Sequence, residues 1–335
     1  MAYVNKYIND PDNIVEETVS GYAKAFSDRI KKVESTNVLA RVNQTAGKVG
    51  IIIGNGSGHE PACLGFVGEH MLDCNAYGGL FAAPGPFGIL DAIKEADTGN
   101  GVIVLISAHA GDILNSKMAI DMAEDDGLIV DSILLYDDVA SAPKDYPHEE
   151  RRGSVGTIFV YKMAGSYSSE MKSLAEIKTF IENVRDNTRT ICSARQPGSS
   201  PITGEKMFEL EQGEVLVGLG VHGESARKTY KDKGSDRIAF DMLEELTSDI
   251  ELSEGDEVSV IVNNLGSTTM MELMIFYNAI ETKLTEKGIK VYKPLIGTFT
   301  TTQEMAGIGL SICKMDEEMK KQWSKKTNAP HFPNL

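Results

Sequence analysis

Short apolar runs that end in glycine alternate with segments of helical periodicity along the first half of the chain. Residues 48–54 (KVGIIIG) and 101–107 (GVIVLIS) are rich in β-branched residues and predict buried strands. Apolar residues at helical spacing between Ile14 and Phe26 predict a helix, whose start Asp10-Pro11-Asp12 can cap. This alternation predicts βαβ units and a largely parallel sheet. Further helices are predicted at 87–96, 113–123, 155–164 and 173–187, and a strand at 128–135.

The second half has the same character after a looser stretch, 193–201, that is rich in Ser, Pro and Gly. We therefore expect two domains, 1–187 and 188–335, a number that the length of 335 residues supports. The predicted fold class is α/β, with a mixed or mostly parallel sheet flanked by helices in each domain. In the second half, strands are predicted at 214–219, 257–262 and 290–296, and helices at 236–246 and 268–282.

The net charge of the chain makes some classes of binding partner improbable. Lys plus Arg number 33 and Asp plus Glu 49, which gives a formal charge of −16. Direct binding to nucleic acid or to an anionic membrane is therefore disfavoured. The four cysteines include no CxxC pair, the N-terminus lacks a basic, apolar leader, and no apolar run reaches the roughly twenty residues of a membrane helix. These features predict a cytoplasmic protein with reduced thiols.

The densest candidate site is the segment 54–61 (GNGSGHEP), which directly follows a predicted strand. Its alternate glycines let backbone N–H groups approach a ligand, and Ser57, His59 and Glu60 add polar groups. It is not a dinucleotide fingerprint, because His59 occupies the sixth position, and the chain has no GxxxxGK[ST] phosphate loop. The segment is either a ligand-binding turn or a tight connection.

A strict GxGxxG occurs at 218–223 (GLGVHG) after a predicted strand. A dinucleotide-binding unit also needs a helix, a second strand and an acidic residue about twenty positions on. Ile238, Met242 and Leu246 continue at helical spacing there instead. Three interpretations stay open: a dinucleotide turn, a structural histidine, or glycines that present His222 to a pocket at the end of a strand.

Residues 107–112 (SAHAGD) follow the second buried strand, so His109 or Asp112 would lie at its carboxyl end, beside the first glycine turn. Open α/β sheets bind ligands at that edge. Alternatively, Asp112 caps a helix that begins at residue 113, and both roles are compatible.

Four weaker motifs complete the set. The pair Asp137-Asp138 could bind a metal or lie in a solvated loop, and Arg151-Arg152 could hold an anion or form surface ion pairs. Residues 263–267 (NNLGS) predict a turn and a helix start. The lysines at 320–321 and 325–326 alternate with acidic residues and predict a solvated helix face.

Taken together, these segments resemble the dihydroxyacetone-binding subunit family of the phosphotransferase-dependent dihydroxyacetone kinases, the DhaK family. The resemblance runs in order along nearly the whole chain. It rests on 54–61 (GNGSGHEP), 66–68 and 71–72, 111–112 (GD), 137–140 (DDVA), 151–153 (RRG), 218–224 (GLGVHGE) and 263–266 (NNLG).

This resemblance implies two α/β domains, a homodimer, and a short ketone such as dihydroxyacetone held covalently as a hemiaminal on the histidine that matches His222. It also implies that His59 hydrogen-bonds the substrate and that Asp112 is the general base for the phosphorylated hydroxyl. The segment Gly56, Ser57 and Gly58 would cradle the substrate. A neutral imidazole nitrogen can add to a ketone carbonyl, so the assignment to His222 is chemically consistent.

The same resemblance implies that this chain binds no cofactor or metal itself. ADP and magnesium are expected on a partner subunit, which a phosphocarrier of the sugar phosphotransferase system recharges. The missing phosphate loop agrees with that division.

Three segments depart from the family pattern. Residues 107–110 (SAHA) replace Lys-Asn-Tyr-Thr, 83–86 (APGP) replace Ser-Pro-Thr-Pro, and 224–226 (ESA) replace Glu-Pro-Gly. One paralogue, the co-activator DhaQ, binds dihydroxyacetone and activates a transcription factor. The sequence therefore supports a kinase subunit and, as the alternative, a catalytically silent sensor, while an unrelated sugar-phosphate or nucleotide enzyme is a third interpretation.

Overall fold

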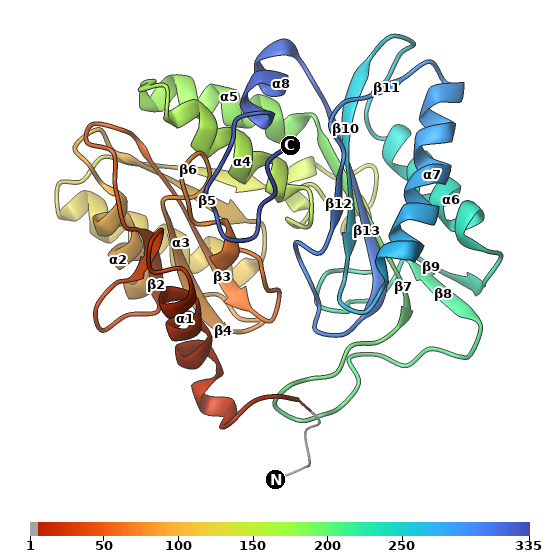
Figure 1. The fold of residues 1–335 in the computed structure, drawn as a ribbon, viewed down its shortest axis with the longest axis horizontal. Coiled ribbons are helices and arrows are strands. Elements are labelled where there is room, and N and C mark those ends of the chain that lie inside the picture. The colour runs from red at the N-terminus through yellow and green to blue at the C-terminus, as the bar shows by residue number, and fades with distance from the viewer. Residues whose placement is uncertain (1–5) are drawn as a thin grey trace. The chain divides into compact units, whose positions relative to one another are not determined.

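The computed structural model describes residues 6–335, which form two compact units (Figure 1). The N-terminal unit consists of Ile8–Leu135, Thr157–Asp186 and Lys321–Leu335. The C-terminal unit consists of Tyr136–Gly156 and Asn187–Lys320, together with residues 6–7. Each unit is therefore completed by segments that are distant in the sequence.

The N-terminal unit is built on a six-stranded mixed sheet with the order β1-β2-β4-β3-β5-β6. The predicted strands 48–54, 101–107 and 128–135 are confirmed as β3, β5 and β6, which pair in parallel as expected. β4 also joins β3 in parallel, whereas β1 and β2 form an antiparallel edge that the hydrophobic pattern did not indicate. The strands are β1 (Ile30–Lys32), β2 (Val38–Arg41), β3 (Gly50–Ser57), β4 (Cys74–Leu80), β5 (Val102–Ser107) and β6 (Val130–Leu135).

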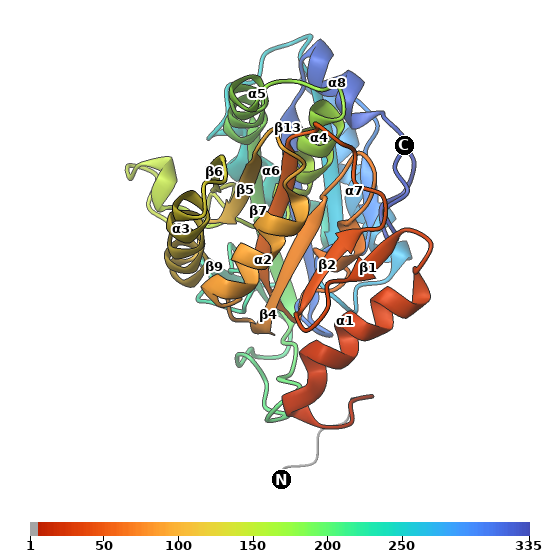
Figure 2. The same ribbon diagram turned by 90° about the vertical axis from the view of Figure 1, so that its left-hand side faces the viewer.

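Helices cover both faces of this sheet. α2 and α3 pack on the face that carries Ile52 and Val104, and Figure 2 shows them in front of the sheet. The alternate residues of the strands, such as Ile51 and Ile103, are equally buried and belong to the opposite face. α4 contacts β3 and α5 contacts β5 and β6. The predicted helices are confirmed as α1 (Ile14–Ala25), α2 (Pro86–Ala96), α3 (Ala110–Asp125), α4 (Thr157–Ser168) and α5 (Leu174–Asp186).

The C-terminal unit is built on a seven-stranded sheet with the order β11-β10-β13-β7-β8-β9, in which β12 also pairs with β10. Only β11 and β12 run parallel to β10, and the other pairs are antiparallel. The sheet is thus mixed. Its strands are β7 (Thr188–Gln196), β8 (Glu214–Val217), β9 (Lys228–Lys231), β10 (Glu257–Asn264), β11 (Lys290–Val291), β12 (Leu295–Gly297) and β13 (Ala306–Lys314).

Two predictions for this sheet need correction. The strand predicted at 290–296 is divided into β11 and β12, since Pro294 lacks the N–H that a continuous ladder requires. The loose stretch predicted at 193–201 is wrong for its first four residues, which end β7. Strands β7 and β13 were not predicted, because polar residues interrupt their apolar pattern. Those residues pair with one another instead: Thr190 Oγ1 lies 2.7 Å from Ser311 Oγ across the two strands.

α6 (Ser235–Thr247) and α7 (Met270–Glu286) pack side by side on one face of this sheet and form its apolar core with Val260 and Leu310 (Figure 1). Both were predicted, at 236–246 and 268–282. α7 begins with a reciprocal capping box between Thr269 and Glu272. The last helix is α8 (Glu317–Trp323). Within residues 6–335, no helix has the length and apolar character needed to cross a membrane.

Candidate functional site

The first glycine turn continues strand β3 and needs glycine for steric reasons. A Cβ atom at Gly56 would lie 2.8 Å from the backbone nitrogen of Ala82, and Gly58 has a φ of 102°. The Glu60 carboxylate accepts the N–H of Gly58 at 2.9 Å, which fixes the turn from within. Burial raises the pKa of Glu60, and this hydrogen bond opposes the shift. Glu60 thus acts as a support of the turn.

Two polar side chains of this turn, Ser57 and His59, are almost completely buried. The Ser57 side-chain oxygen has no hydrogen-bond partner among the described residues, although Ser57 is only 1% exposed. His59 is 8% exposed, and the centroid of its ring lies 5.0 Å from that of Phe81. A buried hydroxyl without a hydrogen-bond partner costs about 1–3 kcal/mol.

Asp112 lies at the same edge of the sheet, because β3 and β5 are parallel neighbours. α3 begins at Ala110, so Asp112 is in its first turn and the prediction that it caps a helix starting at residue 113 is wrong. A carboxylate in that turn still interacts favourably with the helix dipole. His109 Nδ1 lies 3.2 Å from Ser107 Oγ and 4.0 Å from Asp112 Oδ2. The N-terminal unit therefore gathers Gly56, Ser57, Gly58, His59, His109 and Asp112, which we call the N-terminal cluster.

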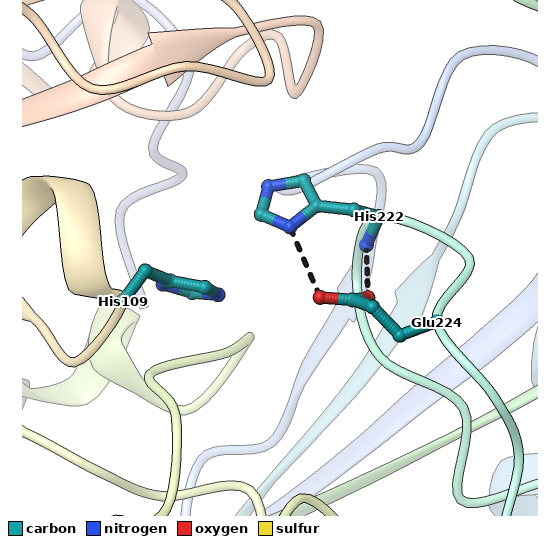
Figure 3. A group of neighbouring side chains, drawn as sticks. All are labelled: His109, His222 and Glu224. Carbon is teal, nitrogen blue, oxygen red and sulfur yellow. Dashed lines mark hydrogen bonds and ion pairs between the residues drawn. The ribbon is translucent and has the colours of Figure 1, made fainter.

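The second glycine segment follows β8 in the C-terminal unit and presents His222. Its Nδ1 atom lies 3.2 Å from Glu224 Oε1, and its backbone N–H donates to Glu224 Oε2 at 2.8 Å. Figure 3 shows both contacts; His109, also drawn there, belongs to the N-terminal unit. A Cβ atom at Gly220 would lie 2.1 Å from Glu224 Oε2, so glycine there makes room for the carboxylate. The dinucleotide interpretation is wrong, since β9 returns antiparallel to β8 where a helix would be needed.

The charge of Glu224 sets the tautomer of His222. Burial alone would raise the pKa of Glu224, but the hydrogen bond and charge of His222 hold it well below its usual range. An ionised carboxylate can only accept, so Nδ1 of His222 carries the proton. Arg152 pairs with the same carboxylate and fixes it further. In a neutral His222 the lone pair of the ring then lies on Nε2, which is the nucleophilic atom of this tautomer.

A buried carboxyl group, Asp138, interacts electrostatically with Glu224. Burial and the charges of Asp137 and Glu224 raise the pKa of Asp138 to about 7. The hydrogen bond from the backbone N–H of Ala140 and the charge of Arg152 act in the opposite direction. Asp137 accepts the N–H groups of Ser154 and Gly156, each at 2.8 Å. Both aspartates are less than 5% exposed, so the solvated-loop interpretation is wrong. We call His222, Glu224, Arg152 and Asp138 the C-terminal cluster.

The two arginines of the pair Arg151-Arg152 have different partners: Arg152 pairs with Glu224, whereas Arg151 pairs with Asp249. Its guanidinium donates to both carboxylate oxygens of Asp249, at 2.7 and 2.6 Å, and Arg189 pairs with the same group. Arg151 is 1% exposed, so the surface ion-pair interpretation is wrong for it. These arginines hold the pKa of Asp249 down to about 2, although burial opposes them.

The two remaining motifs serve structure. Asn264 Oδ1 accepts the N–H groups of Gly266 and Thr268, at 2.8 and 2.9 Å, which confirms a turn before α7. The prediction of a solvated helix face is wrong for Lys325 and Lys326, because α8 ends at Trp323. Lys320 lies on α8 and pairs with Glu257, and Lys325 pairs with Glu170. Sequence reasoning named Arg152 as a possible anion-binding or surface ion-pair residue and Glu224 as part of a motif, but it missed the contacts that join both to His222. The position of Glu224 two residues after His222 was the available signal.

The two clusters lie in a chain whose relationship to known proteins is clear. The model of the Dak1 domain matches residues 20–331. This chain belongs to the Dak1 family. Among the Dak1 proteins, it is 38% identical to the dihydroxyacetone-binding subunit DhaK of a PTS-dependent dihydroxyacetone kinase from Listeria innocua, over 94% of this chain and 95% of that protein. The predicted resemblance is thereby confirmed.

Solved Dak1 structures include both a regulator and an enzyme. The dihydroxyacetone kinase operon co-activator DhaQ is 31% identical, with a TM-score of 0.89 over 94% of this chain and 97% of the other. The dihydroxyacetone kinase of C. freundii is 26% identical, with a TM-score of 0.88 over 99% of this chain and 61% of the other. The Dak1 fold thus occurs in proteins with different roles, and the site residues have to distinguish them.

Proposed function

We propose that the chain binds dihydroxyacetone as a hemiaminal on His222 and presents a hydroxyl group for phosphorylation by a nucleotide-carrying partner subunit. The sugar phosphotransferase system would supply the phosphate. The observation that carries the proposal is the contact of Glu224 with Nδ1 of His222, because it places the lone pair of the ring on Nε2, the atom that would attack a carbonyl carbon. The name of the Listeria innocua relative supports the choice of ketone.

In this mechanism, the lone pair of Nε2 forms the C–N bond while the carbonyl π bond breaks. The new alkoxide oxygen takes a proton from water, which releases hydroxide to the solvent, and the ring becomes an imidazolium whose Nδ1–H still donates to Glu224. The carboxylate stabilises that positive charge as it develops. Glycerol has no carbonyl group, so the covalent step excludes it.

The roles that we propose for the N-terminal cluster toward dihydroxyacetone come from the family resemblance. Gly56, Ser57 and Gly58 would cradle it, with the Ser57 hydroxyl as one hydrogen-bonding group. His59 would hydrogen-bond the substrate, and Asp112 would accept the proton of the attacking hydroxyl as phosphate is transferred. ADP and magnesium would be held by the partner subunit, and this chain would work as a homodimer.

The test uses native mass spectrometry of the full chain with dihydroxyacetone, followed by phosphoryl transfer with the partner subunit and phosphocarrier of the same organism. We expect one dihydroxyacetone adduct per chain. His222→Ala should abolish the adduct, whereas His148→Ala, at a partly exposed histidine of the same unit, should retain it. Asp112→Asn should keep the adduct and lose phosphoryl transfer. An adduct that survives His222→Ala would overturn the covalent assignment.

A second candidate function is a dihydroxyacetone sensor that activates a transcription factor. Two observations favour it: the similarity to the co-activator DhaQ, and the replacement of the family's Lys-Asn-Tyr-Thr by residues 107–110 (SAHA). The same experiment separates the two functions. An adduct without turnover, in the presence of active partner subunits, would favour the sensor and exclude the kinase subunit.

A further inference from the structure

Three exposed apolar side chains lie on the two helices that cover one face of the N-terminal sheet. Phe87 of α2 is 71% exposed, and Leu114 and Met118 of α3 are 61% and 47% exposed. Single exposed apolar residues are ordinary on a protein surface, whereas a group of them bordered by polar residues marks an interaction site. We call Phe87, Leu114 and Met118 the apolar patch. None of these residues has a role in the proposed function.

Contacts between α2 and α3 show that the three side chains belong to one surface. Nδ2 of Asn115 on α3 donates to the carbonyl of Pro84, three residues before Phe87, at 2.9 Å. Lys94 of α2 pairs with Asp126, which directly follows α3, with 2.7 Å between Nζ and Oδ2. Phe87 precedes Lys94 by seven residues, so both lie on the flank of α2 that faces α3. The first turns of the two helices are therefore neighbours.

This surface adjoins the edge of the sheet where the N-terminal cluster lies. β4 and β5 both run parallel to β3, so α2 and α3, which follow them, start at the same carboxyl edge. Asp112 is in the first turn of α3, and Leu114 is two residues further along that helix. Phosphoryl transfer requires that the reacting atoms approach to about 3.5 Å. A subunit that delivers phosphate to a hydroxyl group at Asp112 therefore comes to lie against the starts of these helices.

The charges beyond the apolar patch indicate what such a partner presents. Asp121 and Asp125 follow Leu114 and Met118 by seven residues, so they lie on the same face of α3, two turns further on. Both are exposed. α3 as a whole contains four carboxylates and one lysine, Lys117. A partner that matches this surface has an apolar contact area flanked by Lys or Arg residues.

We propose that the apolar patch and the acidic turns after it form the docking surface for the nucleotide-carrying partner subunit. This inference rests on the proposed function, since it assigns a surface to the partner named there. Leu114 and Met118 would enter an apolar contact with the partner, and Asp121 and Asp125 would pair with its basic residues. The apolar contact would supply most of the affinity, and the charges would guide the approach of the two proteins.

The experiment is biolayer interferometry of the full chain with the purified partner subunit of the same organism, loaded with ADP and magnesium. We expect Leu114→Arg to weaken binding by at least about tenfold, the equivalent of about 1.4 kcal/mol, because it places a charge in the apolar contact. Leucine and arginine have similar helix propensities, so α3 should be retained. Asp121→Lys should slow association, and the association rate of the unmodified chain should fall as the salt concentration rises.

Ile129→Arg is the matched control. Ile129 is 63% exposed in the same unit, but it precedes β6 and therefore lies at the opposite edge of the sheet. This variant should bind the partner subunit like the unmodified chain. Binding that Leu114→Arg leaves unaffected, or that Ile129→Arg weakens equally, would overturn the proposal. Conversion of a homodimer to monomers by Leu114→Arg in analytical ultracentrifugation would also overturn it, because the patch would then be a contact between two copies of this chain.

Native mass spectrometry of the same variants separates this inference from the proposed function. Leu114→Arg should retain the dihydroxyacetone adduct, because Leu114 is outside both clusters. A missing adduct in the unmodified chain would overturn the proposed covalent site. A retained adduct, together with partner binding that Leu114→Arg does not weaken, would overturn the docking surface alone.

Discussion

Glu224 and Asp249 are both carboxylates that arginine holds in place, but the two have different consequences. Glu224 contacts the His222 ring, so its charge acts on the nitrogen that would react. The strongly buried cations that contact Asp249 are Arg151 and Arg189. The charge of Asp249 therefore contributes to the stability of the folded chain. Substitutions of these two residues should therefore separate ligand binding from stability.

Glu224→Gln keeps the size of the side chain and removes its charge. We expect the affinity for dihydroxyacetone to fall about 10- to 100-fold, since a hydrogen bond to a charged group contributes about 1.5–3 kcal/mol. This affinity is measured from the fraction of adduct in native mass spectra at several ligand concentrations. Glu205→Gln, at an exposed carboxylate, is the control. An unchanged affinity would show that Glu224 does not assist His222.

Asp249→Asn leaves two buried guanidinium groups without a counter-charge. We expect the free energy of unfolding to fall by about 3–5 kcal/mol, measured by urea denaturation. Asp186→Asn removes an exposed partner of Arg185 and should cost no more than about 1 kcal/mol. Equal losses in the two variants would contradict the burial argument.

The same pair gives a pH dependence. The pKa of Asp249 is about 2 in the folded chain and near 3.8 in the unfolded chain, so the unfolded state binds more protons between these values. The stabilisation is complete above about pH 4 to 5 and is lost as the pH falls through about 2. Asp249→Asn should lack this component, so its difference from the unmodified chain should shrink with acidification.

Single residues were predictable from the sequence where a local motif carries them. His59, Asp112 and His222 each follow a strand within a glycine segment, and that local pattern is sufficient to single them out. The contact of Arg152 with Glu224 could not be found this way, because the two residues lie 72 positions apart. The burial of Asp138 was equally hidden, since two adjacent carboxylates usually indicate solvent.

At the scale of elements, the helices α1 and α4 illustrate opposite uses of glycine. Gly21 of α1 faces open space, whereas a Cβ atom at Gly165 of α4 would lie 2.0 Å from the carbonyl oxygen of Met71. α4 is buried almost all round its circumference, as expected of a helix between a sheet and further chain. A Cβ atom at Gly165 would meet backbone atoms, so no rotamer change could relieve the contact.

Gly165→Ala should therefore destabilise the chain and Gly21→Ala should stabilise it. For Gly21→Ala we expect a gain of about 0.5–1 kcal/mol in the free energy of unfolding, the ordinary preference for alanine in a helix. For Gly165→Ala the clash should outweigh that gain, with a net loss of about 1–3 kcal/mol. Urea denaturation of both variants tests the pair, and stabilisation by Gly165→Ala would show that α4 can move away from Met71.

Elements with clear periodicity were predicted well, and the central strands of the second sheet were not. β7 (TRTICSARQ) and β13 (AGIGLSICK) alternate too weakly, because their polar residues find partners across the sheet. Antiparallel pairing also brings together strands separated by long segments, which a local pattern does not reveal. The predicted βαβ order was accordingly accurate for the N-terminal unit, where parallel neighbours are close in the sequence.

At the scale of the whole molecule, the chain returns to its N-terminal unit at the end. Residues 321–335 belong to that unit, where Trp323 is fully buried against Phe159 and Phe332, with ring centroids 4.8 and 5.6 Å away. Lys162 of α4 donates to the Gln322 carbonyl at 3.4 Å, and Gly68 leaves room for Ala329. This segment contributes to the core of the unit and is more than a surface extension.

Deletion of residues 321–335 should therefore destabilise the N-terminal unit more than the C-terminal unit. Removing the buried Trp323 alone should cost about 3–5 kcal/mol. Hydrogen exchange followed by mass spectrometry should show lost protection in peptides of β3 and α4, with peptides of β10 and α7 less affected. Trp323→Phe is the control and should retain most protection. Uniform loss of protection across both units would contradict the assignment of this segment.

Trp323 is also the only tryptophan in the chain. The tryptophan fluorescence of the chain therefore originates wholly from the segment packed on the N-terminal unit, and the C-terminal unit contributes no tryptophan signal. Circular dichroism, by contrast, averages over the helices of both units. Comparing the two spectroscopic transitions in one denaturation series would reveal directly, without labelling, whether the units lose their structure together or one after the other.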